Sequence, residues 1–147
     1  MVGCFGVVVI TQEEFNYTDD EKRLISAKEI LNKKYSYVDL EIDFESKYYG
    51  PNSSSPSYKG VFNYTRNGLS LSIPVRLTPM YFVSSNDIVC FDYVSMTSES
   101  SETPRASGRI YTGYNQDASS QHSKGEFDLS ISYYDDNGKF TNIKLTN

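Results

Sequence analysis

Four acidic residues alternate with apolar residues in one short segment, and carboxylates in such a row can serve acid–base catalysis or bind a cation. They are Asp39, Glu41, Asp43 and Glu45. On one face of a strand, neighbouring members of the row lie ~6.6–7 Å apart, within the range of glycosidase pairs. A catalytic pair also needs two different environments, so that one acid stays protonated. Four equivalent acids offer no such difference, so we expect a solvated face here.

Tyrosine is the second feature with chemical potential, because the chain holds 13 Tyr and no Trp. An exposed tyrosine ring offers a large contact area and a polar tip, although tyrosine also suits ordinary half-buried strand positions. Adjacent pairs must expose one ring if they lie in strands, since side chains alternate between faces. We therefore predict a binding surface on the solvent side of a sheet or at its loop ends, for a protein or small ligand, preferably basic. The predicted binding residues are Asp39, Glu41, Tyr48, Tyr49, Tyr133 and Tyr134.

Residues typical of catalysis or metal binding are few. The single histidine, His122, lies in a polar Ser-rich loop without an orienting acid, so we expect no catalytic role. Cys4 and Cys90 lack metal-ligand spacing; two buried thiols are the preferred interpretation, and a disulfide or a lipidated Cys4 are the alternatives. Residues 135–138 lack the ligand spacing of a calcium loop and fit a hairpin turn. We predict no catalytic residue, metal ligand or cofactor.

Length and charge narrow the class of protein. The 147 residues carry 14 basic and 19 acidic side chains, a net charge of -5, and we predict one globular domain over residues 1–147. Because no cluster of Lys and Arg is available to neutralise phosphates, we expect no nucleic-acid partner. No apolar run approaches the ~20 residues of a membrane-spanning helix, so we predict no transmembrane segment. The oligomeric state is not indicated.

The amino-terminal residues allow two interpretations. In the first, residues 7–10 form a buried strand. In the second, Val2-Gly3-Cys4 resembles the end of a bacterial lipoprotein signal, which makes residues 1–6 the remnant of a tether. Residues 27–35 are similar to the opening of many small exported bacterial domains, without identifying a family. We therefore expect an exported or cell-surface location rather than a cytoplasmic one.

One helix is well signalled over residues 19–34. Thr18 and Glu21 form a capping box in which each side chain satisfies an amide of the other residue. Asp19 and Asp20 lie in the first turn and Lys33 and Lys34 in the last turn, where the helix dipole favours acidic and basic side chains respectively. An apolar stripe over residues 24–31 predicts the face that packs on a sheet, with Lys22, Arg23 and Glu29 on the opposite face.

Period-two alternation and turn signals predict the strands. The clearest strand points four apolar side chains inward, those of Val38, Leu40, Ile42 and Phe44. Two segments with turn signals, Asn67-Gly68 and residues 135–138, are each predicted to join two strands as a hairpin. Pro74 then requires an edge strand or a bulge. For residues 87–96 two inward registers compete, one through Ile88 and Cys90, the other through Val89 and Phe91. The predicted strand ranges are 37–45, 58–65, 69–77, 80–83, 87–96, 108–114, 126–134 and 139–145.

These elements predict an α+β fold, one amino-terminal helix packed on a curved antiparallel sheet of six to eight strands. A mainly-β sandwich or barrel with an appended helix is the competitor. The expected function is a small non-enzymatic binding or interaction domain. The alternative is a small-molecule enzyme with a pocketed helix-on-sheet fold of the NTF2-like kind and an Asp or Glu base. An interior acid would favour the enzyme, and the candidates Asp87, Asp92 and Asp128 are all expected to face outward.

Overall fold

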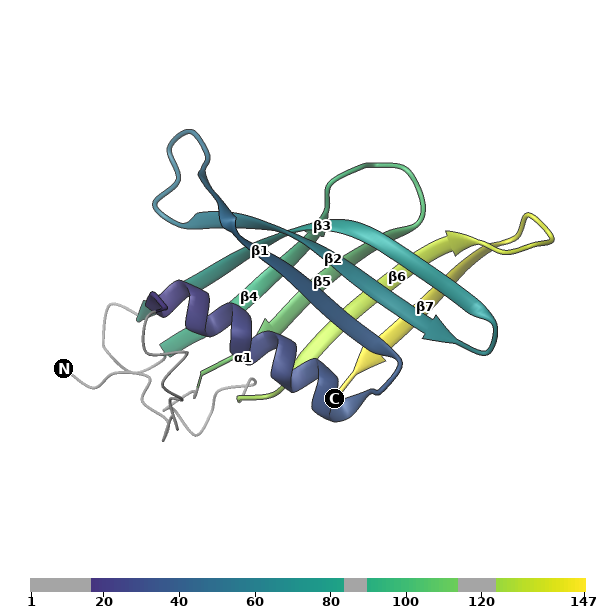
Figure 1. The fold of residues 1–147 in the computed structure, drawn as a ribbon, viewed down its shortest axis with the longest axis horizontal. Coiled ribbons are helices and arrows are strands. Elements are labelled where there is room, and N and C mark those ends of the chain that lie inside the picture. Colours follow the sequence, from purple (N-terminus) through teal and green to yellow (C-terminus); the bar gives the residue numbers. More distant parts are fainter. Residues whose placement is uncertain (1–16, 84–89, 114–123) are drawn as a thin grey trace.

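The fold is α+β, with one helix packed on an open antiparallel sheet of seven strands in the part of the chain described by the computed structural model, residues 17–83, 90–113 and 124–147. The strands follow one another in the sheet in the order of the sequence, from β1 to β7, and the two edges do not join into a barrel (Figure 1). The elements are α1 (Asp19–Lys34), β1 (Val38–Tyr49), β2 (Pro56–Arg66), β3 (Leu69–Val83), β4 (Cys90–Ser98), β5 (Arg105–Tyr111), β6 (Phe127–Tyr134) and β7 (Phe140–Thr146).

The helix has the predicted bounds. The Glu21 amide donates to Thr18 Oγ1 at 3.2 Å, which caps the first turn, and the Thr18 hydroxyl donates to the Glu21 carboxylate at 2.9 Å. The second half of the box thus joins two side chains, where the sequence predicted a bond to the Thr18 amide. Leu24, Ala27 and Leu31 are fully buried against the sheet, as the apolar stripe predicted.

The inner face of the sheet holds the core. In Figure 1 the sheet is strongly twisted, and α1 lies across the concave face of the sheet. All seven strands send apolar side chains to this face, and these form one cluster with the buried face of α1. The strand members of the cluster are Val38, Leu40, Tyr58, Phe62, Tyr64, Ile73, Val75, Leu77, Val94, Met96, Ala106, Ile110, Phe127, Leu129, Ile131 and Leu145. Ile42, predicted to point inward, packs at the margin of this cluster.

Because consecutive strands are antiparallel neighbours in the sheet, their connections alternate between its two ends. The β2–β3, β4–β5 and β6–β7 loops lie at one end of the sheet, and the β1–β2 loop lies at the other (Figure 1). Asn67 and Gly68 both have positive φ, as the predicted hairpin turn requires. Asp135 Oδ1 accepts the Asn137 and Lys139 amides at 2.9 Å, so residues 135–138 form the expected turn.

Pro74 corrects one prediction, since it lies in β3, an interior strand without a bulge at that position. Its carbonyl accepts the Glu99 amide at 3.0 Å, which places its ring nitrogen on the same side, toward β4. The β3–β4 ladder begins only at Val75, opposite Ser98. The missing N–H therefore points just past the end of β4, where no ladder bond is lost.

The β5 strand also begins earlier than predicted, at Arg105 instead of 108. Inside it, Gly108 has φ +147, and a Cβ at this position would lie 2.0 Å from the Asp128 carbonyl oxygen. Only glycine allows β5 and β6 to approach this closely. Since β5 carries the residues of the groove described below, this contact sets their position against β6.

Candidate functional site

The six predicted binding residues lie at different places in the sheet. Asp39 and Glu41 are on the outer face near the start of β1, and Tyr48 and Tyr49 are at the far end of the same edge strand. Tyr133 and Tyr134 are in β6, which four strands separate from β1, or about 24 Å along the sheet. The structure therefore does not bring the acids and the two tyrosine pairs together as one surface.

The acidic row on β1 is partly compensated by the helix. Lys28 Nζ lies 2.9 Å from Asp39 Oδ1 and also donates to the Leu40 carbonyl at 2.8 Å. The hydrogen bond from Lys28 holds the pKa of Asp39 below its ordinary value of 3.8. Asp43 accepts the Glu45 amide within an irregular stretch between Asp43 and Tyr48. Glu41, Asp43 and Glu45 are exposed on this edge and form no ion pair with a described residue, so three acids of the row stay accessible to the predicted basic partner.

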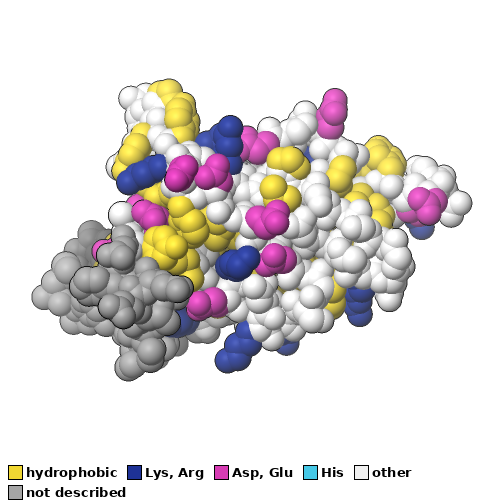
Figure 2. Space-filling model, in the orientation of Figure 1, with side chains coloured by type: hydrophobic (Ala, Val, Ile, Leu, Met, Phe, Trp, Pro, Cys, Tyr) yellow, Lys and Arg dark blue, Asp and Glu magenta, His cyan; other side chains and the backbone are white. Residues whose placement is uncertain are grey.

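The tyrosines at the end of β1 stand beside cations. Tyr48 and Tyr49 are each 53% exposed. The Arg76 guanidinium carbon lies 5.4 Å from the Tyr48 ring centre, and Lys47 Nζ lies 5.4 Å from the Tyr49 ring centre. The hydrogen bond with Tyr49 also raises the pKa of Lys47. Hydrophobic side chains gather at the upper left of Figure 2, where Figure 1 places this end of β1, and further hydrophobic patches lie among scattered acidic and basic side chains over the rest of the view.

The second tyrosine pair is divided between the two faces of β6. Tyr133 is half-buried and packs against the core cluster, while Tyr134 is 61% exposed on the outer face. Tyr134 stands opposite Phe140 in β7, with ring centres 5.5 Å apart in an edge-to-face arrangement. Phe140 is 52% exposed, so two aromatic rings meet on the surface. The prediction that one ring of a pair is exposed holds here, and Phe140 is a neighbour that the sequence did not single out.

Beside this ring pair the outer face is hollowed into a groove of about 320 Å³. It lies over β5 and β6 and is bordered by the β4–β5 loop. Five of its eight lining residues carry hydroxyl groups, and Arg105 is the only charged one. The lining residues are Ser101, Thr103, Arg105, Ala106, Ser107, Ser130, Ser132 and Phe140. We refer to this hollow as the hydroxyl groove.

Strand register fixes the order of groups across the hydroxyl groove. Arg105 pairs with Ser132, and Ser132 pairs with Asn142, so these side chains form one row on the outer face. Tyr134 and Phe140 form the next row, two residues further along, or ~7 Å away. The polar row and the aromatic row are thus adjacent and held by the ladders of three strands.

The hydroxyls of the groove differ in what they can offer a ligand. Ser130 and Ser132 both donate to Asn142 Oδ1, at 3.0 and 3.1 Å, so each keeps only lone pairs for a further bond. The side chains of Ser107 and Arg105 form no hydrogen bond or ion pair with any other residue that the structure describes. The groove therefore presents hydrogen-bond acceptors over β6 and donors over β5.

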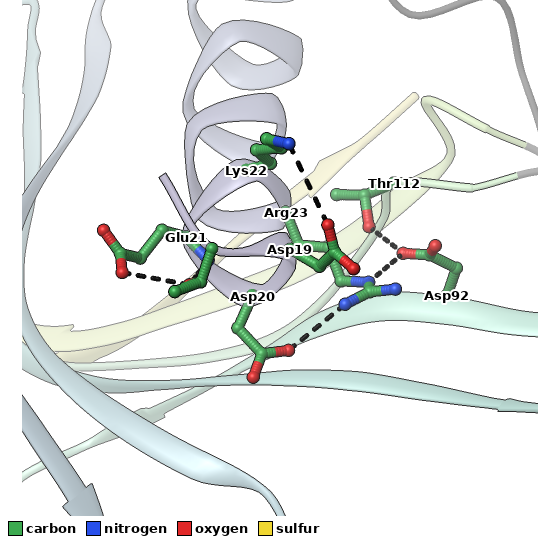
Figure 3. Close-up of polar contacts among 8 residues, drawn as sticks. Asp19, Asp20, Glu21, Lys22, Arg23, Asp92 and Thr112 are labelled. Carbon is green, nitrogen blue, oxygen red and sulfur yellow. Dashed lines mark hydrogen bonds and ion pairs between the residues drawn. The ribbon is translucent and has the colours of Figure 1, made fainter. Parts of the chain in front are cut away.

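An interior acid is present, contrary to the sequence-based prediction. Asp92 in β4 faces α1, with its side chain 10% exposed, and Arg23 Nε lies 3.1 Å from its carboxylate. Thr112 Oγ1 donates to the same carboxylate at 2.6 Å, and Asp20 holds the other side of the guanidinium at 3.2 Å. Figure 3 shows Arg23 pointing between the two acids. Arg23, predicted on the solvent side of the helix, is therefore a core-facing anchor with the ring of Tyr81 at 4.7 Å.

Choosing the register of β4 in which Val94 and Met96 face inward would have placed Asp92 on the inner face. Val94 and Met96 are both fully buried, so even-numbered residues of β4 face inward, and Asp92 belongs to that set. The sequence left two registers open because both sets contain apolar residues. Asp128 does face outward, as predicted, while Asp87 lies outside the described residues. His122 and Cys4 lie outside them as well, as does the side chain of Cys90.

Tyr58 is a second buried polar group on the inner face. The residue is fully buried, and its hydroxyl has no hydrogen-bond partner among the described residues. Burial raises the pKa of this hydroxyl above its ordinary value of 10.0, with Lys47 acting in the opposite sense. The ring of Tyr58 is therefore part of the core cluster.

Comparison with protein-family models, with curated proteins and with solved structures finds no match. Within the described ranges, no three His, Cys, Asp or Glu side chains gather as a metal site would require. None of the helices described there has the length and apolar character needed to cross a membrane. The inference about function consequently depends on the geometry of the outer face.

Proposed function

We propose that this protein is a non-enzymatic binding domain that holds a saccharide in the hydroxyl groove. The observation that carries the proposal is the adjacency of a hydroxyl-lined hollow and an exposed aromatic pair on one rigid sheet face. Saccharides combine many hydroxyl groups with an apolar C–H face. Hydroxyl side chains match the first property, and a ring such as that of Phe140 buries the second.

The size and construction of the hydroxyl groove support this proposal. Its volume of about 320 Å³ lies at the lower end of the range for small-molecule sites. Most of its groups stand on β5 and β6, which pair residue by residue from Arg105 to Ile110. A site built on paired strands binds with little loss of conformational entropy, because the groups are already in place.

The enzymatic alternative has weaker support. Asp92, the acid inside the fold, has its carboxylate occupied by Arg23 and Thr112. A general base needs a substrate within hydrogen-bond reach, and Asp92 does not line the hydroxyl groove. We therefore favour binding over catalysis. We also propose that the protein acts outside the cytoplasm, supported by the resemblance of Val2-Gly3-Cys4 to a lipoprotein signal.

A glycan array tests the binding function. We expect the folded protein to bind a subset of printed saccharides, and Phe140→Ala to lose this binding because the apolar platform is removed. Phe82→Ala is the matched control, since Phe82 is 44% exposed in β3 and does not line the groove. Equal loss in both variants, or retention in Phe140→Ala, would refute binding at the groove. Thermal melts establish that each variant is folded.

A further inference from the structure

We infer that the saccharide held by the hydroxyl groove carries an anionic group, a carboxylate or a sulfate, and that Arg105 selects it. This inference rests on the proposed function. Its starting point is the charge of the groove, where Arg105 is the single charged lining residue and no acid is present.

Arg105 is available for a ligand. Its side chain is exposed, and it pairs with no other residue in the described part of the chain. Several of the other described arginines are engaged, Arg23 with two acids and Arg76 with Glu99. A guanidinium presents its N–H groups as a planar fork that matches the two oxygens of a carboxylate or sulfate. The unpaired Arg105 fork at the groove thus selects a planar or tetrahedral anion.

A second cation stands on the same face of the sheet, outside the lining of the groove. Lys144 stands opposite Ser130 in the β6–β7 ladder, on the outer face and one row away from Arg105. It is exposed and forms no ion pair with a described acid. Asp128, the nearest outer-face acid of β6, stands opposite Arg109. Glu102 lies in the β4–β5 loop between Ser101 and Thr103, but it does not line the groove and forms no ion pair with Arg105.

The acceptor side of the groove explains why the anion belongs to a saccharide and not to a simple ion. Because Ser130 and Ser132 donate to Asn142, their remaining lone pairs accept bonds only from a ligand that carries donors. Carboxylate and sulfate have none at neutral pH, whereas the hydroxyls of a sugar do. An acidic sugar satisfies Arg105 with its anion, Ser132 with a hydroxyl and Phe140 with its C–H face.

The test compares matched probes on one array, namely oligosaccharides of galacturonate, glucuronate, sialic acid and sulfated sugars, each beside its uncharged parent. We expect preference for the acidic members and a loss of about tenfold or more in Arg105→Gln, the usual cost of a charge-assisted bond. Lys59→Gln is the control, because it removes an exposed cation of the outer face in β2, away from the groove. Added salt should weaken acidic-probe binding by the wild type.

The outcomes separate this inference from the proposed function. Binding of neutral parents that Phe140→Ala abolishes and Arg105→Gln leaves unchanged would retain a saccharide-binding domain and overturn the anionic ligand. Equal losses in Arg105→Gln and Lys59→Gln would overturn selection by Arg105 in favour of general charge attraction. No binding to any printed saccharide by the folded wild type would overturn both proposals.

Discussion

Replacing Asp92 by Asn tests whether the buried ion pair fastens the helix to the sheet. The substitution keeps the shape of the side chain and an oxygen that can accept from Thr112, but it removes the charge opposite Arg23. The Arg23 side chain, which is 17% exposed, then keeps only Asp20 of its two acidic partners. We expect a clear loss of stability because a cation remains partly desolvated without its nearer counter-ion.

The magnitude follows from the exposure of the two partners. Removing one member of a fully buried ion pair costs about 3–5 kcal/mol, because the other charge stays buried and unpaired. Here Arg23 retains some solvent contact and the Asp20 carboxylate at 3.2 Å, so we expect about 2–3 kcal/mol. For a domain with a total stability of about 5–15 kcal/mol, this loss is easily measured.

Urea unfolding followed by far-ultraviolet circular dichroism measures the change in the free energy of unfolding. Asp20→Asn is the matched control, because it removes the other acid from the same guanidinium. The Asp20 side chain is 31% exposed, so its loss should cost no more than about 1 kcal/mol. A cost for Asp92→Asn equal to that of Asp20→Asn, or within about 0.5 kcal/mol of zero, would refute the anchoring role.

Two further predictions concern the sheet and the helix contact at its edge. Gly108→Ala should destabilise the protein by more than about 2 kcal/mol, because the added Cβ would lie 2.0 Å from the Asp128 carbonyl oxygen. Gly138→Ala is the control and should cost less, since its Cβ would meet no atom in the open turn. Equal melting temperatures of the two variants would contradict this prediction. Asp39→Asn should lower the free energy of unfolding by less than about 1 kcal/mol above pH 5. The difference should disappear as the pH falls below about 3.8, because the bond from Lys28 stabilises the fold only while the Asp39 carboxylate is charged, which is what its lowered pKa reflects. A pH-independent difference would show that the bond from Lys28 does not depend on this charge.

The helix and the hairpins could be predicted because their signals are local. The Thr18 cap, the apolar stripe of α1 and the alternation from Val38 to Phe44 each lie within a short stretch of chain. Asn67-Gly68 likewise fixes a turn without reference to distant residues. In all of these, the sequence pattern and the final burial depend on the same few neighbours, so local reasoning was sufficient.

The interior ion pair and the hydroxyl groove depend on contacts between distant segments. Arg23 and Asp92 are 69 positions apart, and an acid in a strand is ordinarily expected to face water. The groove gathers Arg105, Ser132 and Phe140 from three strands, and their meeting depends on two registers that the sequence did not specify. Residues 105–107 contain one apolar residue, which is too few to reveal the start of β5.

The position of the helix decides which face of the sheet is available to a ligand. Leu24 and Leu31 are fully buried between α1 and the inner face, and burial of each such side chain is worth about 1.5–3 kcal/mol. A ligand entering beneath α1 would forfeit about 3–6 kcal/mol from these two residues alone, a large part of the stability of a small domain. It would also separate Arg23 from Asp92. The outer face demands no such rearrangement, because the hydroxyl groove already exists between paired strands and the β4–β5 loop. Binding on the outer face is therefore compatible with an intact core.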